Sequence, residues 1–220
     1  MITRMQDLPR DGRRALLLFS GGFDSTFVGL TLRHSGVGYI CLSIQHPNRP
    51  RQERLAAEGL LADIGCDGIL TATLDLQDYR HQPNHWPSDR HEGWIPFRNV
   101  VFFGIAAHYA VMEGCDIIAS GVRIWDTTAY NDATLEYLSR LEAMLGESGA
   151  PGIPSRPLEL YLPLIQAHAP IVEFINAHPA VLETLQRSWS CWRDREAPCG
   201  ICAPCRTRAQ FLAGFDKEQS

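Results

Sequence analysis

Two groups of residues have types and spacings suited to chemistry. The first lies in LLLFSGGFDSTFVGL, residues 16–30, where a short apolar run meets two glycines and then helix-like apolar spacing. This pattern predicts a strand, a tight loop and a helix, and N–H groups and hydroxyls at such a helix start bind phosphate. The residues of this predicted phosphate loop are Ser20, Gly21, Gly22, Asp24, Ser25 and Thr26. An ordinary strand-to-helix turn capped by Asp24 or Ser25 is the alternative.

The spacing of this loop excludes two better-known phosphate-binding motifs. A Walker loop requires a Lys before its Ser or Thr, and a dinucleotide fingerprint requires a third glycine where Ser25 stands. The loop resembles instead the SGGxDS loop of the ATP pyrophosphatases, which split ATP between its α and β phosphates. This resemblance implies that the loop binds the pyrophosphate of ATP, with Mg²⁺ neutralising the leaving group.

The second group is a set of four cysteines near the C-terminus, Cys191, Cys199, Cys202 and Cys205. The last three are spaced as overlapping CxxC steps, and four thiolates so placed suit tetrahedral Zn²⁺. An iron–sulfur cluster and disulfides are the alternatives. A Cys₄ site has no open position, so we expect a structural zinc ion that holds Ser190, Trp192 and Arg206 against the main domain. Cys41, Cys66 and Cys115 lie in apolar surroundings typical of core thiols.

Strands and helices alternate along the rest of the chain. Buried β-branched strands in this order predict an α/β fold, a parallel sheet covered by helices on both faces, with functional sites at the carboxyl ends of the strands. After the first strand and helix, the expected strands lie at 37–44, 67–75, 116–122 and 160–165, and the expected helices at Arg51–Ile64, Asn99–Met112 and Asp132–Leu145.

We expect two structural units. Residues 1–150 form an ATP pyrophosphatase-type nucleotide-binding domain, and residues 151–220 a C-terminal helical segment with the Cys₄ motif. Residues 76–96 form a polar and aromatic loop that is long for a compact domain. It carries three histidines, His81, His85 and His91. A second metal site is conceivable there, but the spacing beside two tryptophans favours a substrate lid.

Composition limits the classes of partner. The chain has 220 residues, of which 45% are hydrophobic, and a formal net charge of -5. This charge argues against nucleic acid and anionic membranes as partners and favours a small molecule. No apolar run approaches the ~20 residues that span a bilayer, and the N-terminus lacks the apolar core of a signal peptide. We therefore expect a cytoplasmic protein.

Further motifs, in the same order along the chain, resemble those of the 7-cyano-7-deazaguanine synthases, the QueC family. WIPFRNVVFF resembles the P-x-R-N-x-x-F segment of the family, and SGVRIWDTTAYND its G-V-x-x-x-D-x-x-x-Y-x-D loop. YLPLI, SWSCW and CGICAPCRTRAQF follow in order, so the resemblance covers about residues 14–215. The matching positions are Pro96, Arg98, Asn99, Phe102, Gly121, Val122, Asp126, Tyr130 and Asp132.

This resemblance implies an ATP-dependent ligase, with ATP, Mg²⁺ and structural Zn²⁺ as cofactors, that acts on 7-carboxy-7-deazaguanine. ATP adenylates the carboxylate, ammonia displaces AMP, and a second ATP converts the amide into the nitrile. The residues expected to act in catalysis are Asp24, Ser25, Arg98 and Asp126, and those expected to bind the substrate are Arg98, Asn99, Asp126, Tyr130 and Asp132. Three of these residues have a structural alternative: a surface ion pair for Arg98, a helix cap for Asp132 and ordinary packing for Tyr130. The resemblance also implies a homodimer.

The chain departs from the family pattern at four places. Trp189 stands where the family has a tyrosine before the cysteines, and Ala133 stands where it usually has a cysteine after Asp132. His46-Pro47-Asn48 stands where the family carries Tyr-Gly-Gln, and the lysine usual after Pro163-Leu164 is missing. Arg49, Arg123 or His168 could substitute for that lysine. These departures leave four alternatives: the family reaction, a paralogue that adenylates another carboxylate such as a protein C-terminus in a defence system, a nucleotide- and zinc-binding module without catalysis, and a sulfur-transferring or amidating pyrophosphatase acting on tRNA.

Overall fold

The computed structural model describes residues 1–9, 11–47, 49–75, 97–123, 131–147, 157–165 and 169–216. The lid expected at 76–96 therefore lies outside the described residues, as do Asp126 and Tyr130. The elements are η1 Met5–Asp7, β1 Ala15–Leu18, α1 Phe23–Ser35, β2 Tyr39–Gln45, α2 Arg51–Ile64, β3 Ile69–Thr73, α3 Arg98–Met112, β4 Ile117–Ala119, η3 Asn131–Ala133, α5 Leu135–Gly146, β5 Glu159–Tyr161, α6 Ala169–Ala177, α7 Val181–Arg187 and α8 Ala203–Asp216.

The strands form one parallel five-stranded sheet in the order β3-β2-β1-β4-β5. Ala15 of β1 is in register with Tyr39 of β2 on one side and with Ile117 of β4 on the other. The burial of β1, β2 and β4 on both faces explains their nearly continuous apolar sequences. The predicted α/β class is confirmed, and β5 shows that the chain after residue 151 supplies an edge strand of this sheet.

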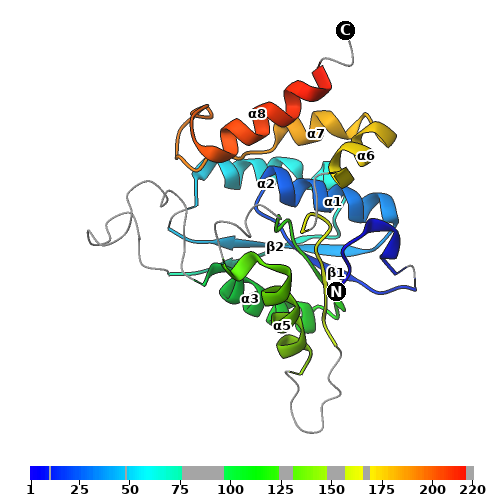
Figure 1. Cartoon of the computed structure of the whole chain (residues 1–220). Coiled ribbons are helices and arrows are strands. Elements are labelled where there is room, and N and C mark those ends of the chain that lie inside the picture. The colour runs from blue at the N-terminus through cyan, green and yellow to red at the C-terminus, as the bar shows by residue number, and fades with distance from the viewer. Residues whose placement is uncertain are drawn as a thin grey trace.

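Helices cover both faces of the sheet (Figure 1). The layer drawn at the top contains α1, α2, α6, α7 and α8, and the layer drawn below contains α3 and α5. Each layer has its own apolar core: Phe27 and Leu60 belong to the upper one, and Phe103 and Leu138 to the lower one. The amphipathic pattern of α2 places Ala57, Leu60 and Ile64 in the core, as expected from spacings of three and four residues.

The strand order places a topological switch point between β1 and β4. The chain runs outward from β1 through β2 to β3, and then returns to the other side of β1 to continue through β4 to β5. In open parallel sheets, the crevice outside the carboxyl ends of the two strands at such a point is the usual binding site. We therefore expect the functional site at the loops that follow β1 and β4.

Among the described residues, none of the helices has the length and hydrophobicity of a membrane span.

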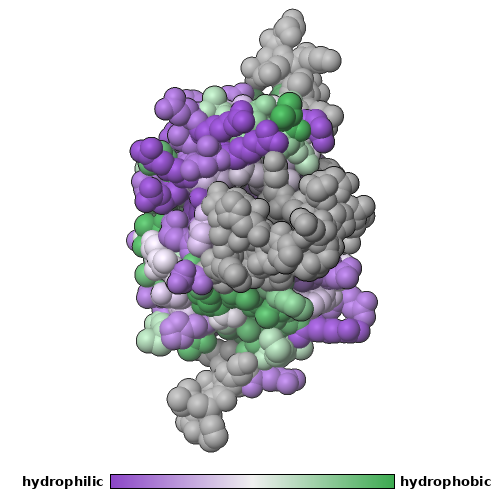
Figure 2. Space-filling view, turned by 90° about the vertical axis from the view of Figure 1, so that its left-hand side faces the viewer, coloured by the Kyte–Doolittle hydropathy of each residue, from purple (hydrophilic) through white to green (hydrophobic). Residues whose placement is uncertain are grey.

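Figure 2 views the side of the molecule toward which β2 points. Hydrophilic side chains gather over its upper part and hydrophobic ones over its lower part, below the atoms drawn in grey. The exposed arginines Arg51, Arg54 and Arg195 belong to α2 and the C-terminal segment, which lie in the upper layer.

Candidate active site

The predicted phosphate loop is held in shape by its own hydroxyl groups. The Oγ atom of Ser20 accepts a 3.1 Å hydrogen bond from Gly22 N and lies 3.2 Å from Ser25 Oγ, with which it shares a second. Ser25 Oγ donates to the carbonyl oxygen of Gly22 at 3.1 Å. Gly22 is the N-cap of α1, so the first N–H groups of this helix lack intrahelical partners and are available to an anion.

Two of the six residues predicted to bind the cofactor, Gly21 and Thr26, are not among the described residues that line the cleft, and they support the loop from its buried side. Thr26 is fully buried, and its Oγ1 donates a 2.9 Å hydrogen bond to Gly22 O. Gly21 has φ 84°, and a Cβ there would stand 2.4 Å from the backbone nitrogen of Ala57. Because Gly21 has no side chain, the backbone of α2 can approach it closely. The sequence predicted instead that Gly21 would contact the phosphate. The other four line the cleft described below: Ser20, Gly22, Asp24 and Ser25.

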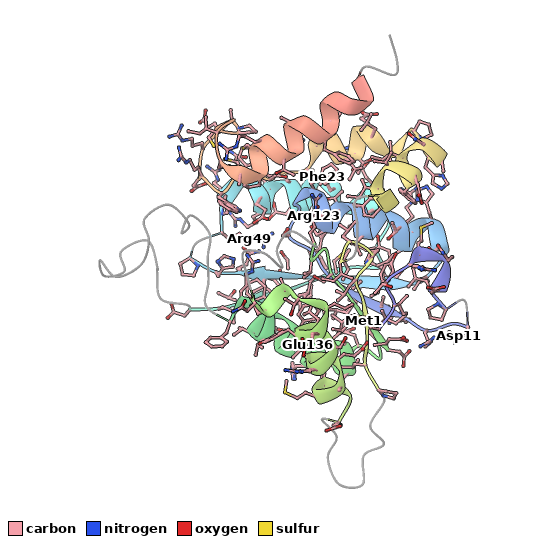
Figure 3. All side chains as sticks on the ribbon, in the orientation of Figure 1. Met1, Asp11, Phe23, Arg49, Arg123 and Glu136 are labelled. Carbon is pink, nitrogen blue, oxygen red and sulfur yellow. The ribbon has the colours of Figure 1, made fainter. Side chains whose placement is uncertain are left out.

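Asp24 forms an ion pair with Arg123, which follows β4. The Arg123 side chain is 9% exposed and the Asp24 side chain 36%. The guanidinium of Arg123 also lies 5.5 Å from the centre of the Phe23 ring, within the range of a cation–π interaction. Figure 3 labels Phe23 in the upper helical layer and Arg123 just below it, toward the sheet. At the switch point, a partly buried charge pair therefore joins the loop after β1 to the loop after β4.

Arg49 fixes the phosphate loop to β2. Its side chain is 3% exposed, and its Nη2 donates a 2.6 Å hydrogen bond to the carbonyl oxygen of Ser20. Its Nη1 donates to Ser43 Oγ at 2.8 Å, and its Nε lies 3.4 Å from Glu53 Oε2. Burial raises the pKa of the Glu53 carboxyl, against the lowering effect of Arg49. Arg49 is consequently a structural cation of the loop, already bonded on several sides.

Arg98 and Asn99 open α3 at the edge of the same cleft. The backbone N–H of Asn99 donates to Asp132 Oδ2 at 3.1 Å, and Asn99 Nδ2 donates to Asp132 O at 2.9 Å. Asp132 therefore caps α3, whose residue Asn99 lies 33 residues earlier in the chain, and does not cap the helix that follows it in sequence. That helix, α5, begins after Asn131–Ala133 and is capped by Thr134, whose Oγ1 accepts from Tyr137 N at 3.2 Å.

These residues surround a cleft of about 320 Å³ at the carboxyl ends of the strands. The phosphate loop forms one end, and the segment Trp189–Trp192 forms part of the wall. Two predicted substrate residues, Arg98 and Asn99, line it, whereas Asp132 lies behind them and is not among the described lining residues. The wall also includes Leu42, Ile44, His46, Arg49, Glu53, Phe102, Ser120, Gly121 and Val122.

The four C-terminal cysteines come together as predicted. Their sulfur atoms all lie within 4.8 Å of one another, and two pairs, Cys199–Cys205 and Cys191–Cys202, are 4.0 Å apart. Backbone N–H groups point at the sulfurs: that of Cys202 donates to Cys199 Sγ at 3.4 Å. Hydrogen bonds from this N–H and from that of Ile201 lower the pKa of Cys199 to about 6. The cluster could hold a metal ion, and its separations fit four thiolates about one tetrahedral ion.

The cysteine cluster is attached to the phosphate loop. The N–H of Trp189, just before the cluster, donates a 2.9 Å hydrogen bond to the carbonyl oxygen of Gly21. Asp194, inside the cluster, accepts from the first N–H of α2 at 2.9 Å. The ring of Phe211 on α8 packs edge-on against Phe23, with 5.1 Å between ring centres. Ser190 and Trp192 line the cleft, whereas Arg206 is exposed.

The parallel sheet, with the SGGFDS loop at the carboxyl end of β1, has the fold of the PP-loop ATP pyrophosphatases. A solved structure described as a 4-thiouridine synthetase–RNA complex with bound ATP superposes with a TM-score of 0.50 at 17% identity, covering 94% of this chain and 53% of that one. This similarity concerns the fold alone.

The chain belongs to the QueC family, because the family profile described as queuosine biosynthesis protein QueC matches residues 14–217. The 7-cyano-7-deazaguanine synthase of Campylobacter hominis is 23% identical and covers 94% of this chain and 98% of its own length. The 7-cyano-7-deazaguanine synthase of Campylobacter curvus is 27% identical and covers 93% of this chain and 94% of its own length. The resemblance seen in the motifs is confirmed, and the chain is an ATP-using enzyme of the ligase type, divergent from these relatives.

Proposed function

We propose that the protein converts 7-carboxy-7-deazaguanine and ammonia into 7-cyano-7-deazaguanine, releasing AMP and pyrophosphate. The observation that carries this proposal is that the phosphate loop opens into the same cleft as Arg98 and Asn99. One cleft therefore offers anion-binding N–H groups and a guanidinium suited to a carboxylate. The match to the QueC family and the names of its relatives support this reaction over other adenylations.

In the first step, the substrate carboxylate attacks the α-phosphate of ATP and pyrophosphate leaves. The N–H groups at the start of α1, with Ser20 and Ser25, would hold the pyrophosphate, and Arg98 would orient the carboxylate by a bidentate pair. Ammonia then displaces AMP to give the amide. A second ATP activates the amide oxygen, and loss of AMP and a proton leaves the nitrile. We assign Asp126 and Tyr130 to the substrate by resemblance alone.

Two metals belong to the proposal. Asp24 and Glu53 both line the cleft beside the phosphate loop, and burial raises the pKa of the Glu53 carboxyl, against the lowering effect of Arg49. A cation suits this place, and Mg²⁺ carried by ATP would neutralise the pyrophosphate there. For the cysteine cluster we propose a structural Zn²⁺, since the sulfur separations fit a single tetrahedral ion.

Mass spectrometry tests this function. The zinc-replete protein is incubated with Mg-ATP, ammonium and 7-carboxy-7-deazaguanine, and both the deazaguanine and the nucleotides are identified. We expect the nitrile together with AMP, and a much lower yield with Asp24→Asn, which keeps the side-chain shape but removes the charge. ADP as the sole nucleotide product would disprove the proposal.

A second function has one specific observation in its favour. His46 lines the cleft at the place where the chain departs from the family pattern, so the pocket is suited to a related but different carboxylate. If ATP binds and 7-carboxy-7-deazaguanine is returned unchanged, this candidate replaces the first. The AMP-forming activity should then be screened against other carboxylates, including protein C-termini.

Cytoplasmic location and homodimerisation are further parts of the proposal. The described cysteines are all free thiols, which agrees with a reducing compartment. Light scattering coupled to size-exclusion chromatography measures the molar mass in solution, and the mass of a single chain would disprove the homodimer.

A further inference from the structure

His46 occupies a defined place in the cleft. It follows directly after β2, which pairs with β1, the strand that leads into the phosphate loop. Its ring lies beside Phe102 of α3, with 5.8 Å between ring centres. Leu42 and Ile44, from the strand that precedes His46, also line the cleft. The imidazole thus stands between a phosphate-binding loop and an apolar, aromatic surface.

One nitrogen of this imidazole is left without a partner. Nδ1 of His46 is buried, and none of the described residues makes a hydrogen bond to it. Leaving a buried polar atom unsatisfied costs about 1–3 kcal/mol, and a packed core would replace such a residue by an apolar one. The His46 side chain lines the cleft, so a molecule bound there can supply the missing hydrogen bond.

The electrostatic surroundings determine which kind of molecule fits. Burial, Arg49 and Arg98 lower the pKa of His46 to about 4, so the imidazole is neutral near pH 7. A neutral imidazole offers one donor and one acceptor, which suits the edge of a heterocyclic ring and does not suit a phosphate or a carboxylate. The apolar walls suit the faces of such a ring. The anionic groups of a ligand are left to the phosphate loop and to Arg98.

We propose that His46 is a ligand-positioning residue whose Nδ1 forms a hydrogen bond with the edge of a purine-type ring held against Phe102. This inference rests on the proposed function, which brings two such rings into the cleft, the adenine of ATP and the deazaguanine of the acceptor. Both present donors and acceptors along one edge, and binding measurements distinguish them.

Three substitutions separate the chemistry of this nitrogen from the shape of the ring. His46→Phe keeps an aromatic ring and removes both nitrogens. His46→Asn places an amide at the position of Nδ1, and His46→Gln places it at the position of Nε2. Calorimetry measures the affinity of each variant for ADP and for 7-carboxy-7-deazaguanine separately, without turnover, and thermal melting measures stability.

We expect His46→Phe to bind one of the two ligands about tenfold more weakly, as for the loss of one hydrogen bond. His46→Asn should recover most of this loss, and His46→Gln should not. The melting temperature of His46→Phe should stay equal to that of the wild type or rise, because Nδ1 has no described protein partner.

The proposal is overturned if His46→Phe binds both ligands as the wild type does. It is also overturned if His46→Asn is no better than His46→Phe, or if the loss of affinity follows a loss of stability. Wild-type protein that binds a ring but forms no nitrile would disprove the proposed reaction and leave the role of His46 intact. Wild-type protein that binds neither ring would remove both.

Discussion

The N–H of Trp189 lies 2.9 Å from the carbonyl oxygen of Gly21, so a residue next to the cysteine cluster is hydrogen bonded to the middle of the phosphate loop. These two residues come from opposite ends of the chain. A metal at the four cysteines would fix Trp189 and, through this bond, the predicted phosphate loop. The cysteine cluster and the predicted phosphate loop are therefore connected by a direct hydrogen bond.

Metal removal should accordingly weaken nucleotide binding. We expect about one Zn²⁺ per chain by elemental analysis, and chelation or Cys202→Ser should lower the melting temperature and the affinity for ADP together. Cys115→Ser is the control, because Cys115 is a buried thiol outside the cluster, and this variant should keep the metal. A visible absorption band that disappears on reduction would indicate an iron–sulfur cluster and contradict the zinc assignment.

Substitution of Gly21 should destabilise the protein strongly. Gly21→Ala combines a left-handed φ of 84° with a Cβ placed 2.4 Å from Ala57 N, and we expect a loss of more than about 2 kcal/mol in the free energy of unfolding. Gly36→Ala is the matched control, because Gly36 has φ 70° with nothing within 4 Å of its added Cβ. It should cost about 1 kcal/mol in urea titration. Equal losses would show that the close approach of α2 is unimportant.

Arg123 should matter for the chemistry of ATP. Its ion pair with Asp24 fixes a carboxylate beside the phosphate loop, and we propose that its charge replaces that of the lysine missing after Pro163-Leu164. Arg123→Ala should lower kcat/KM for ATP by about tenfold or more, and Arg123→Lys should recover part of it. The control is Arg140→Ala, because Arg140 and Glu136 form an exposed pair with side chains 78% and 75% exposed. A wild-type kcat/KM in Arg123→Ala would exclude this role.

The local parts of the structure were predictable from local patterns. The amphipathic spacing gave the bounds of α2 at Arg51–Ile64, as observed, and the apolar run before Gly21 indicated β1 and the loop. The spacing of the cysteines was sufficient to indicate their convergence, because CxxC turns point both sulfur atoms toward one centre. Each of these features depends on contacts between residues close in sequence.

The parts that sequence reasoning missed depend on long-range contacts. Asp132 was considered as a cap for the next helix, but its carboxylate bonds to Asn99, 33 residues earlier. Arg49 was considered as a substitute phosphate ligand, but its guanidinium is bonded to Ser20, 29 residues earlier. In the sequence, both residues are polar side chains directly after a strand or before a helix. This position indicates that the side chain forms a hydrogen bond but does not indicate with which residue.

Two helix caps of similar strength should differ in their effect on the substrate. Asp132→Ala removes the cap of α3 and Thr134→Ala the cap of α5, and each should cost about 1 kcal/mol of stability. Only α3 carries Arg98 into the cleft. Asp132→Ala should therefore raise KM for the carboxylate several-fold, while Thr134→Ala should leave it unchanged. The same KM in both variants would show that the position of Arg98 does not depend on this cap.

His46 should make the fold less stable in mild acid. Its pKa is about 4 in the folded protein and about 6.5 in an unfolded chain. Above pH 6.5 neither state is protonated, so His46 contributes no pH dependence. Between 6.5 and 4 the unfolded chain binds a proton that the folded protein does not bind, so the free energy of unfolding falls as the pH falls.

We expect this effect to reach about 2 kcal/mol between pH 7 and pH 5. His46→Phe lacks it, whereas the other titrating groups, including Glu53, are common to both proteins and cancel in the difference. Urea unfolding of the two proteins at both pH values measures it. The wild type should lose more stability than His46→Phe, and parallel losses would mean that the folded protein accepts a proton on His46 as readily as the unfolded chain does.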